Sequence, residues 1–102
     1  MGLTSKERVF LKKKAHSLEP VFRVGKDGFS ETLAQGIAEA MELRELLKVK
    51  ILQNSEVEKK EVATQIADYI GADVVSIIGR TIILYKESME KPNISLELKN
   101  LK

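Results

Sequence analysis

The feature that most constrains this chain is residues 20–33, PVFRVGKDGFSETL, where three local signals follow one another without a gap. Residues 21–24 are rich in β-branched and aromatic side chains, which predicts a short strand. Gly25, Lys26, Asp27 and Gly28 predict a tight loop, and Ser30 is a favourable N-cap for a helix beginning at about Glu31. The stretch therefore predicts a strand, a glycine loop and a helix in direct succession.

This order of elements suits a phosphate group. Glycine accepts positive φ angles and lets a ligand approach the backbone closely. The helix that follows directs its free N–H groups and its positive dipole end to the same place, and Lys26 adds a positive charge. The loop has neither the third glycine of a dinucleotide fingerprint nor a GxxxxGK[ST] motif, so nucleotide cofactors are not predicted. An ordinary turn between a strand and a helix remains the alternative interpretation.

Charge is distributed unevenly along the sequence. The net charge of the 102 residues is +2, but residues 1–26 carry +5 and residues 27–47 carry −4. A basic N-terminal third beside an acidic helix predicts one face for a polyanion and another turned away from it.

Composition excludes several classes of site. The chain has no cysteine and one histidine, His16, so thiolate or His-rich metal sites and a Ser/His/Asp set are not expected. No apolar run approaches the ~20 residues of a membrane span, and the N-terminus lacks the apolar region of a secretory signal. We expect a cytoplasmic protein with no cofactor, no metal and no membrane contact.

The first helix is predicted to begin with a capping box of Thr4 and Glu7, and to bury Leu11 and Ala15. The run that follows, Lys12, Lys13 and Lys14, must fan around the exposed side. It is either a solvated face or part of a surface shared with the glycine loop. His16, in the last turn, is expected to satisfy helix carbonyls.

A second helix is predicted from about residue 31 to residue 46, with an acidic polar face that we expect to be in solvent. The strand after it, residues 47–51, alternates with period two. Lys48 and Lys50 should therefore share one side of the sheet, together with Arg23 if the first strand lies alongside.

A second capping box, Ser55 and Glu58, predicts a third helix that stops at Gly71. Residues 74–78 and 81–85 predict a hairpin with Gly79-Arg80 as its turn. Residues 87–102 are expected to form a loosely held charged tail or a short added strand near Ile94 and Leu96. The predicted fold is one α/β domain of order α-β-α-β-α-β-β, with a mixed four-stranded sheet packed by helices in two or three layers.

Four segments together resemble the CRM domain, and in particular the small bacterial YhbY family: LKKKAHSLEP, the GKDG loop, RELLKVKI and IIGRTIILYK. The resemblance covers roughly residues 3–86, so we assign residues 1–86 to the domain and leave the charged tail, residues 87–102, outside it. It implies a fold similar to the C-terminal domain of translation initiation factor three, and RNA binding through a GxxG loop like that of KH domains. Bacterial members associate with precursors of the large ribosomal subunit.

The leading hypothesis is a monomeric, non-catalytic RNA-binding protein acting in large-subunit assembly. Because few aromatic residues are available for base stacking, we expect recognition of RNA shape through the phosphate backbone. The expected RNA-binding residues are the loop and the surrounding cations: Gly25, Lys26, Asp27, Gly28, Arg23, Lys12, Lys13, Lys14, Lys48, Lys50 and Arg80.

Two other functions stay open. An enzyme acting on a phosphoester would need paired carboxylates or a poised base, and Asp27 has no evident carboxylate partner near it in the sequence. A protein-interaction module would use the acidic face of the second helix to contact the ribosome or its assembly factors.

Overall fold

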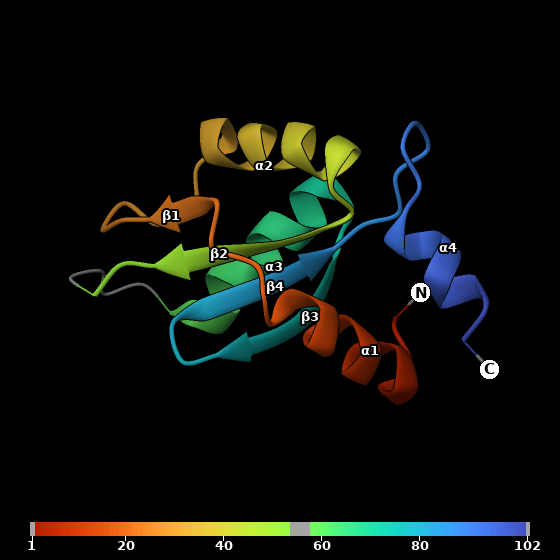
Figure 1. Cartoon of the computed structure of the whole chain (residues 1–102). Coiled ribbons are helices and arrows are strands. Elements are labelled where there is room, and N and C mark those ends of the chain that lie inside the picture. The colour runs from red at the N-terminus through yellow and green to blue at the C-terminus, as the bar shows by residue number, and fades with distance from the viewer. Residues whose placement is uncertain (1, 54–57, 102) are drawn as a thin grey trace.

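A four-stranded mixed sheet in the order β1-β2-β4-β3 forms the middle layer of the computed structural model, which describes residues 2–53 and 58–101 (Figure 1). The strands are β1 (Phe22–Val24), β2 (Leu46–Ile51), β3 (Asp73–Ile78) and β4 (Thr81–Tyr85). The helices are α1 (Ser5–Ala15), α2 (Glu31–Leu43), α3 (Lys59–Ile70) and α4 (Ile94–Lys99). The predicted α/β class and mixed sheet are confirmed.

Strand β4 lies between β2 and β3 and is antiparallel to both, whereas β1 and β2 are parallel. The β3–β4 hairpin closes through Gly79 and Arg80, as predicted. Gly79 has φ +60° at the first central position of this two-residue turn, where a type II′ turn requires a positive φ.

Helices α2 and α3 cover one face of the sheet. The alternation in β2 directs Leu47, Val49 and Ile51 into this core, where each is at most 1% exposed. Gly36 allows α2 to lie close to β1, since a Cβ at this position would be 3.2 Å from the ring of Phe22. This face holds the larger of the two apolar clusters.

Helix α1 covers the opposite face, which makes the domain three-layered, and α4 lies beside α1 beyond the end of β4 (Figure 1). This second cluster joins α1, three of the strands and α4. Its buried members are Leu11, Ala15, Leu46, Val75, Ile83, Tyr85 and Leu98. One sheet thus separates two cores, and the smaller one depends partly on the C-terminal helix.

Most predicted helix ends are found in the structure. Thr4 and Glu7 form the capping box of α1, and α3 ends at Gly71, whose φ is +75°. The prediction for α2 was too long, because the helix ends at Leu43 and the chain enters the sheet at Leu46. Ser55 of the predicted second capping box lies outside the described residues.

The expectation for the C-terminal segment was wrong. Residues 94–99 form helix α4, not a strand or a loose tail, and α4 buries Leu98 against the second cluster. Ion pairs link this segment to the rest of the chain and within itself: Lys14 Nζ lies 2.9 Å from Glu97 Oε1, and Lys99 Nζ lies 3.4 Å from Glu87 Oε2.

Candidate nucleic-acid interface

The glycine loop is a tight turn with an exposed tip. The amide of Gly28 donates to the carbonyl of Gly25 at 3.1 Å, and Gly28 has φ +69°. Lys26 and Asp27 are exposed. A Cβ on Gly25 would meet nothing within 4 Å, so there is space beside the α-carbon at this position. Only Gly28 of this pair uses the left-handed region that favours glycine.

Two contacts fix the junction between the loop and α2. Ser30 Oγ accepts from the amide of Leu33 at 3.1 Å, which caps the helix as the sequence predicts. Phe29 packs edge-on against Tyr69 of α3, with ring centroids 5.8 Å apart and an interplanar angle of 61°. Phe29 therefore anchors the loop to the fold.

The loop shares its end of the sheet with the end of β2 and with the β3–β4 turn (Figure 1). Hydrogen bonds connect the three: Leu52 N donates to Val24 O at 2.9 Å, and Ile51 N donates to Arg80 O at 2.7 Å. Arg80 Nη1 reaches Leu52 O at 3.4 Å. This arrangement brings Arg80 to the same end of the sheet as Lys26, although 53 residues separate them in the chain.

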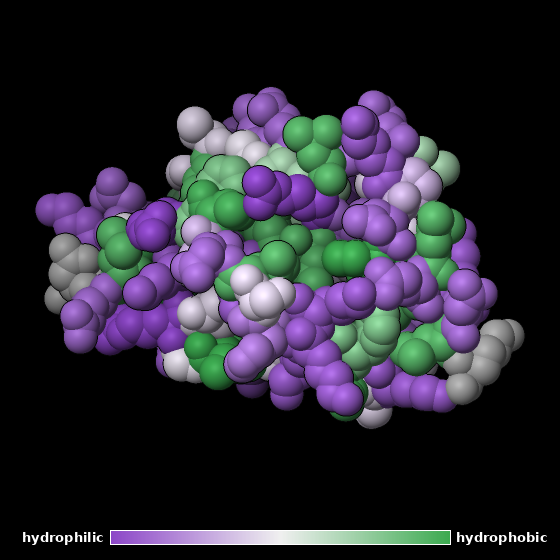
Figure 2. All heavy atoms as spheres, in the orientation of Figure 1, coloured by the Kyte–Doolittle hydropathy of each residue, from purple (hydrophilic) through white to green (hydrophobic). Residues whose placement is uncertain are grey.

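Three cations lie on the α1 side of the sheet, as the alternation predicts. Arg23 of β1 pairs in register with Lys50 of β2, and Lys48 is two residues earlier on the same face. Lys48 Nζ donates to Leu18 O at 3.0 Å, whereas Lys50 is exposed. Hydrophilic residues gather at the left of Figure 2, which is the end of the molecule where Figure 1 places the glycine loop. Hydrophobic residues are exposed nearer the middle of the same view.

The three lysines of α1 have different surroundings. Lys12 lies with Lys48 beside a hollow between α1 and the sheet. It therefore extends the group of cations on this side of the sheet, which we call the basic surface. Lys13 is exposed. Lys14 pairs with Glu97 of α4 and lies 5.6 Å from the ring centroid of Phe10. The structure thus places Lys14 at the contact between α1 and α4, apart from the glycine loop.

Asp27 has carboxylate neighbours that the sequence did not suggest. A hollow of about 390 Å³ beside the loop is lined by Asp27, Glu58 and Glu61, together with Phe29. Within residues 2–53 and 58–101, however, no three acidic or histidine side chains are grouped to hold a metal ion. In the same part of the chain no helix is long and apolar enough to cross a membrane.

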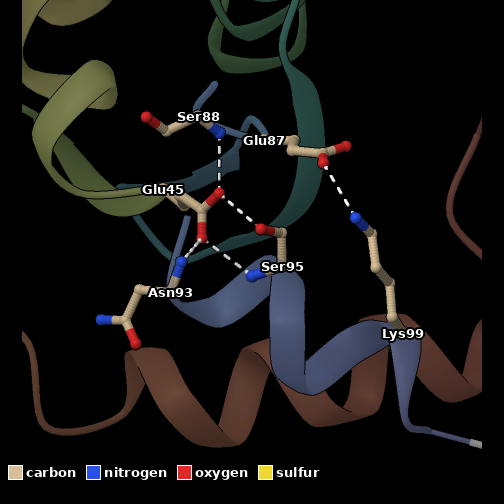
Figure 3. A network of polar contacts seen from close by, with 6 residues as sticks. All are labelled: Glu45, Glu87, Ser88, Asn93, Ser95 and Lys99. Atoms are coloured by element: carbon tan, nitrogen blue, oxygen red, sulfur yellow. Dashed lines mark hydrogen bonds and ion pairs between the residues drawn. The ribbon is translucent and has the colours of Figure 1, made fainter. Parts of the chain in front are cut away.

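Glu45 is the polar residue whose role the sequence analysis missed. It was expected on a solvated acidic face but is 1% exposed, and its carboxylate accepts four hydrogen bonds (Figure 3). The donors are Ser88 N at 2.7 Å, Asn93 N at 2.7 Å, Ser95 N at 2.8 Å and Ser95 Oγ at 2.7 Å. Burial raises the pKa of Glu45, but these hydrogen bonds outweigh it and hold the pKa below its usual value.

The fold, together with the end of the sheet that carries Lys26 and Arg80, defines a class of protein. It is a small three-layer α/β domain with an exposed glycine loop between its first strand and second helix. The model of the CRS1/YhbY (CRM) domain family matches residues 3–86, and the chain belongs to that family.

Two bacterial relatives and one solved structure agree with this assignment. The chain is 48% identical over 94 residues to "Probable RNA-binding protein YqeI" of Bacillus subtilis, covering 92% of this chain and 98% of that one. It is 34% identical to a Haemophilus influenzae protein named "RNA-binding protein", covering 86% and 89%. The solution structure of SAV1595 from Staphylococcus aureus superposes with a TM-score of 0.75 at 38% identity, covering 87% and 93%.

Proposed function

We propose that this protein is a non-catalytic RNA-binding protein whose glycine loop clamps the RNA backbone. The observation that carries the proposal is the convergence of the tight Gly25–Gly28 turn, the exposed Lys26 and a set of cations at one end of the sheet: Arg23, Lys50 and Arg80. Backbone amides and mobile cations in this arrangement complement phosphate oxygens. The names of the B. subtilis and H. influenzae relatives support RNA as the ligand.

We further propose that the RNA is ribosomal and belongs to precursors of the large subunit, as the resemblance to the YhbY family implies. The protein would act as a cytoplasmic monomer. Lys12 and Lys48 extend the basic surface from the loop toward α1. Because these contacts are to phosphates, affinity should fall steeply as salt rises.

Sedimentation of cell extract through a sucrose gradient tests the ribosomal target. Wild-type protein should run with large-subunit precursors, and the Lys26→Glu variant should stay at the top of the gradient. If both stay at the top, the target is not ribosomal. If both run with the particle, the contact lies outside the loop.

Of the two alternatives, the protein-interaction module loses support from the structure. The acidic face of α2 keeps Glu31 and Glu39 exposed, but Glu45 is buried and occupied by the C-terminal segment. A partner protein that still bound after loop substitution would favour that face. Metal-dependent RNA cleavage abolished by Asp27→Asn would favour an enzyme.

A further inference from the structure

A small hollow lies between the last turn of α1 and the sheet, next to the basic end just described. Its volume is about 200 Å³, and residues of α1, β2 and the β3–β4 hairpin, together with His16, line it. The lining residues are Lys12, His16, Lys48, Ile78, Thr81 and Ile83. Thr81 pairs in register with Lys50, so the hollow opens beside the cations of the proposed RNA surface. We call it the α1–sheet pocket.

The pocket combines aliphatic, imidazole and positively charged side chains. Ile83 is 3% exposed and provides an apolar wall, while Ile78 is 55% exposed and offers an aliphatic surface at the rim. His16, at the C-terminal end of α1, contributes a flat ring that can both stack and hydrogen-bond. Lys12 and Lys48 complete the lining and bring two positive charges to it, and Lys48 Nζ donates one hydrogen bond, to Leu18 O at 3.0 Å.

Apolar walls, one planar ring and two cations match a nucleotide better than they match other ligands. A base can lie on the apolar walls and the imidazole while its neighbouring phosphates meet the ammonium groups. The lining has one histidine and no carboxylate, so its donor set does not suit a divalent cation. The volume is below the ~300–1,000 Å³ of ordinary small-molecule sites, which limits the occupant to about one ring group.

We propose that the α1–sheet pocket takes one unstacked base of the bound RNA strand. This inference rests on the proposed function, because the phosphates on either side of the base are those held by Lys12, Lys48 and the glycine loop. It adds a contact that reads the base, and it replaces the expectation that this domain recognises RNA shape alone. His16, expected to serve only as a helix-end residue, becomes part of the binding site.

The test compares two single-stranded 12-nucleotide RNAs of equal charge, one with mixed bases and one with abasic ribose at every position. Wild-type protein should bind the base-containing strand at least about fivefold more tightly, because one stacked base contributes about 1–3 kcal/mol. His16→Ala should remove this preference and leave the dependence of affinity on salt unchanged, since it removes no phosphate contact.

Two further variants guard against a trivial loss of binding. Thr81→Phe should fill the pocket and give the same loss of preference, with a residue that strands favour. Lys12→Gln should weaken binding to both strands. Its control is Lys13→Gln, which makes the same charge change on the neighbouring residue, outside the pocket. Thermal unfolding followed by circular dichroism identifies any variant that has lost its fold.

Equal affinity of the wild type for the two strands would contradict the proposal that the pocket takes a base, while leaving the proposed RNA binding intact. Full base preference in both His16→Ala and Thr81→Phe would also overturn it. Binding of neither strand to the wild type at low salt would overturn both proposals together.

Discussion

Ser95 donates two hydrogen bonds to the buried carboxylate of Glu45, one from its amide at 2.8 Å and one from its hydroxyl at 2.7 Å. This pairing joins the turn between α2 and β2 to the first turn of α4, 50 residues later in the chain. Ser88 N and Asn93 N complete the set (Figure 3). Glu45 therefore holds the C-terminal segment on the domain, beyond the matched residues 3–86.

Replacing Glu45 by Ala should release α4 from the domain. The change leaves three backbone N–H donors without their acceptor, at a cost of about 2–4 kcal/mol. Hydrogen exchange should show lost protection at Ser95 and Leu98, while Val49 and Ile82 of the larger core stay protected. Glu45→Gln keeps an acceptor oxygen and should have a smaller effect. Unchanged protection of α4 in Glu45→Ala would contradict this role.

Acid should weaken the same connection. The pKa of Glu45 is lowered in the folded state from its usual 4.5, so the carboxylate contributes stability that is fully present above about pH 4.5. That contribution is lost as the pH falls through the folded-state pKa. Urea unfolding between pH 3 and pH 6 should show a steeper loss of stability for the wild type than for Glu45→Gln. Parallel curves for the two proteins would contradict the linkage.

A titration to alkaline pH should show that the pKa of Tyr85, which lies near Glu45, is raised in the folded protein. Burial, together with the negative charges of Glu45 and Glu87, raises the pKa of Tyr85 to about 12. Because the folded-state pKa is raised, the stability it contributes is complete below about pH 10 and is lost as the pH rises toward 12. Phenolate absorbance should place this midpoint near pH 12 in the wild type, and Glu45→Gln should lower it. A midpoint near 10 in the folded wild type would count against the buried environment.

The sequence was sufficient for features set by local rules. The period-two alternation in β2 correctly placed Lys48 and Lys50 on one side, and the glycine turns at Gly71 and Gly79 lie where predicted. Glu45 was missed because its hydrogen-bond partners lie 43 to 50 residues away, and a carboxylate in the last turn of a predicted amphipathic helix usually lies in solvent. Helix α4, with six residues, is too short to show a clear period, and its stability depends on packing.

The lysine run shows the same limit at the site. The three residues Lys12, Lys13 and Lys14 are adjacent in the sequence and were therefore predicted as one group. Packing separates them, because Lys12 lines the α1–sheet pocket whereas Lys14 pairs with Glu97 of α4. Lys14→Gln should therefore weaken RNA binding less than Lys12→Gln. Its effect on stability should stay within about 1 kcal/mol, since the ion pair with Glu97 is partly exposed. Equal losses of RNA affinity in the two variants would place both lysines on the RNA surface.

The two loop glycines should respond differently to alanine. Gly28 has φ +69°, so Gly28→Ala should destabilise the fold by about 1–2 kcal/mol. Gly25 has no positive φ and has room for a Cβ, so Gly25→Ala should leave the melting temperature unchanged. If RNA approaches the backbone there, Gly25→Ala should nevertheless weaken RNA binding. A Gly25→Ala protein with wild-type affinity would show that the backbone at Gly25 makes no close contact.

The affinity for RNA at several salt concentrations tests the central claim most directly, with wild type, Lys26→Glu and Lys6→Glu compared. Lys6 lies in the first turn of α1 and provides the same charge reversal away from the loop. If the loop clamps the backbone, Lys26→Glu weakens binding and reduces the slope of log affinity against log salt by about 1, whereas Lys6→Glu does neither. Identical affinities and slopes for Lys26→Glu and wild type would contradict the account.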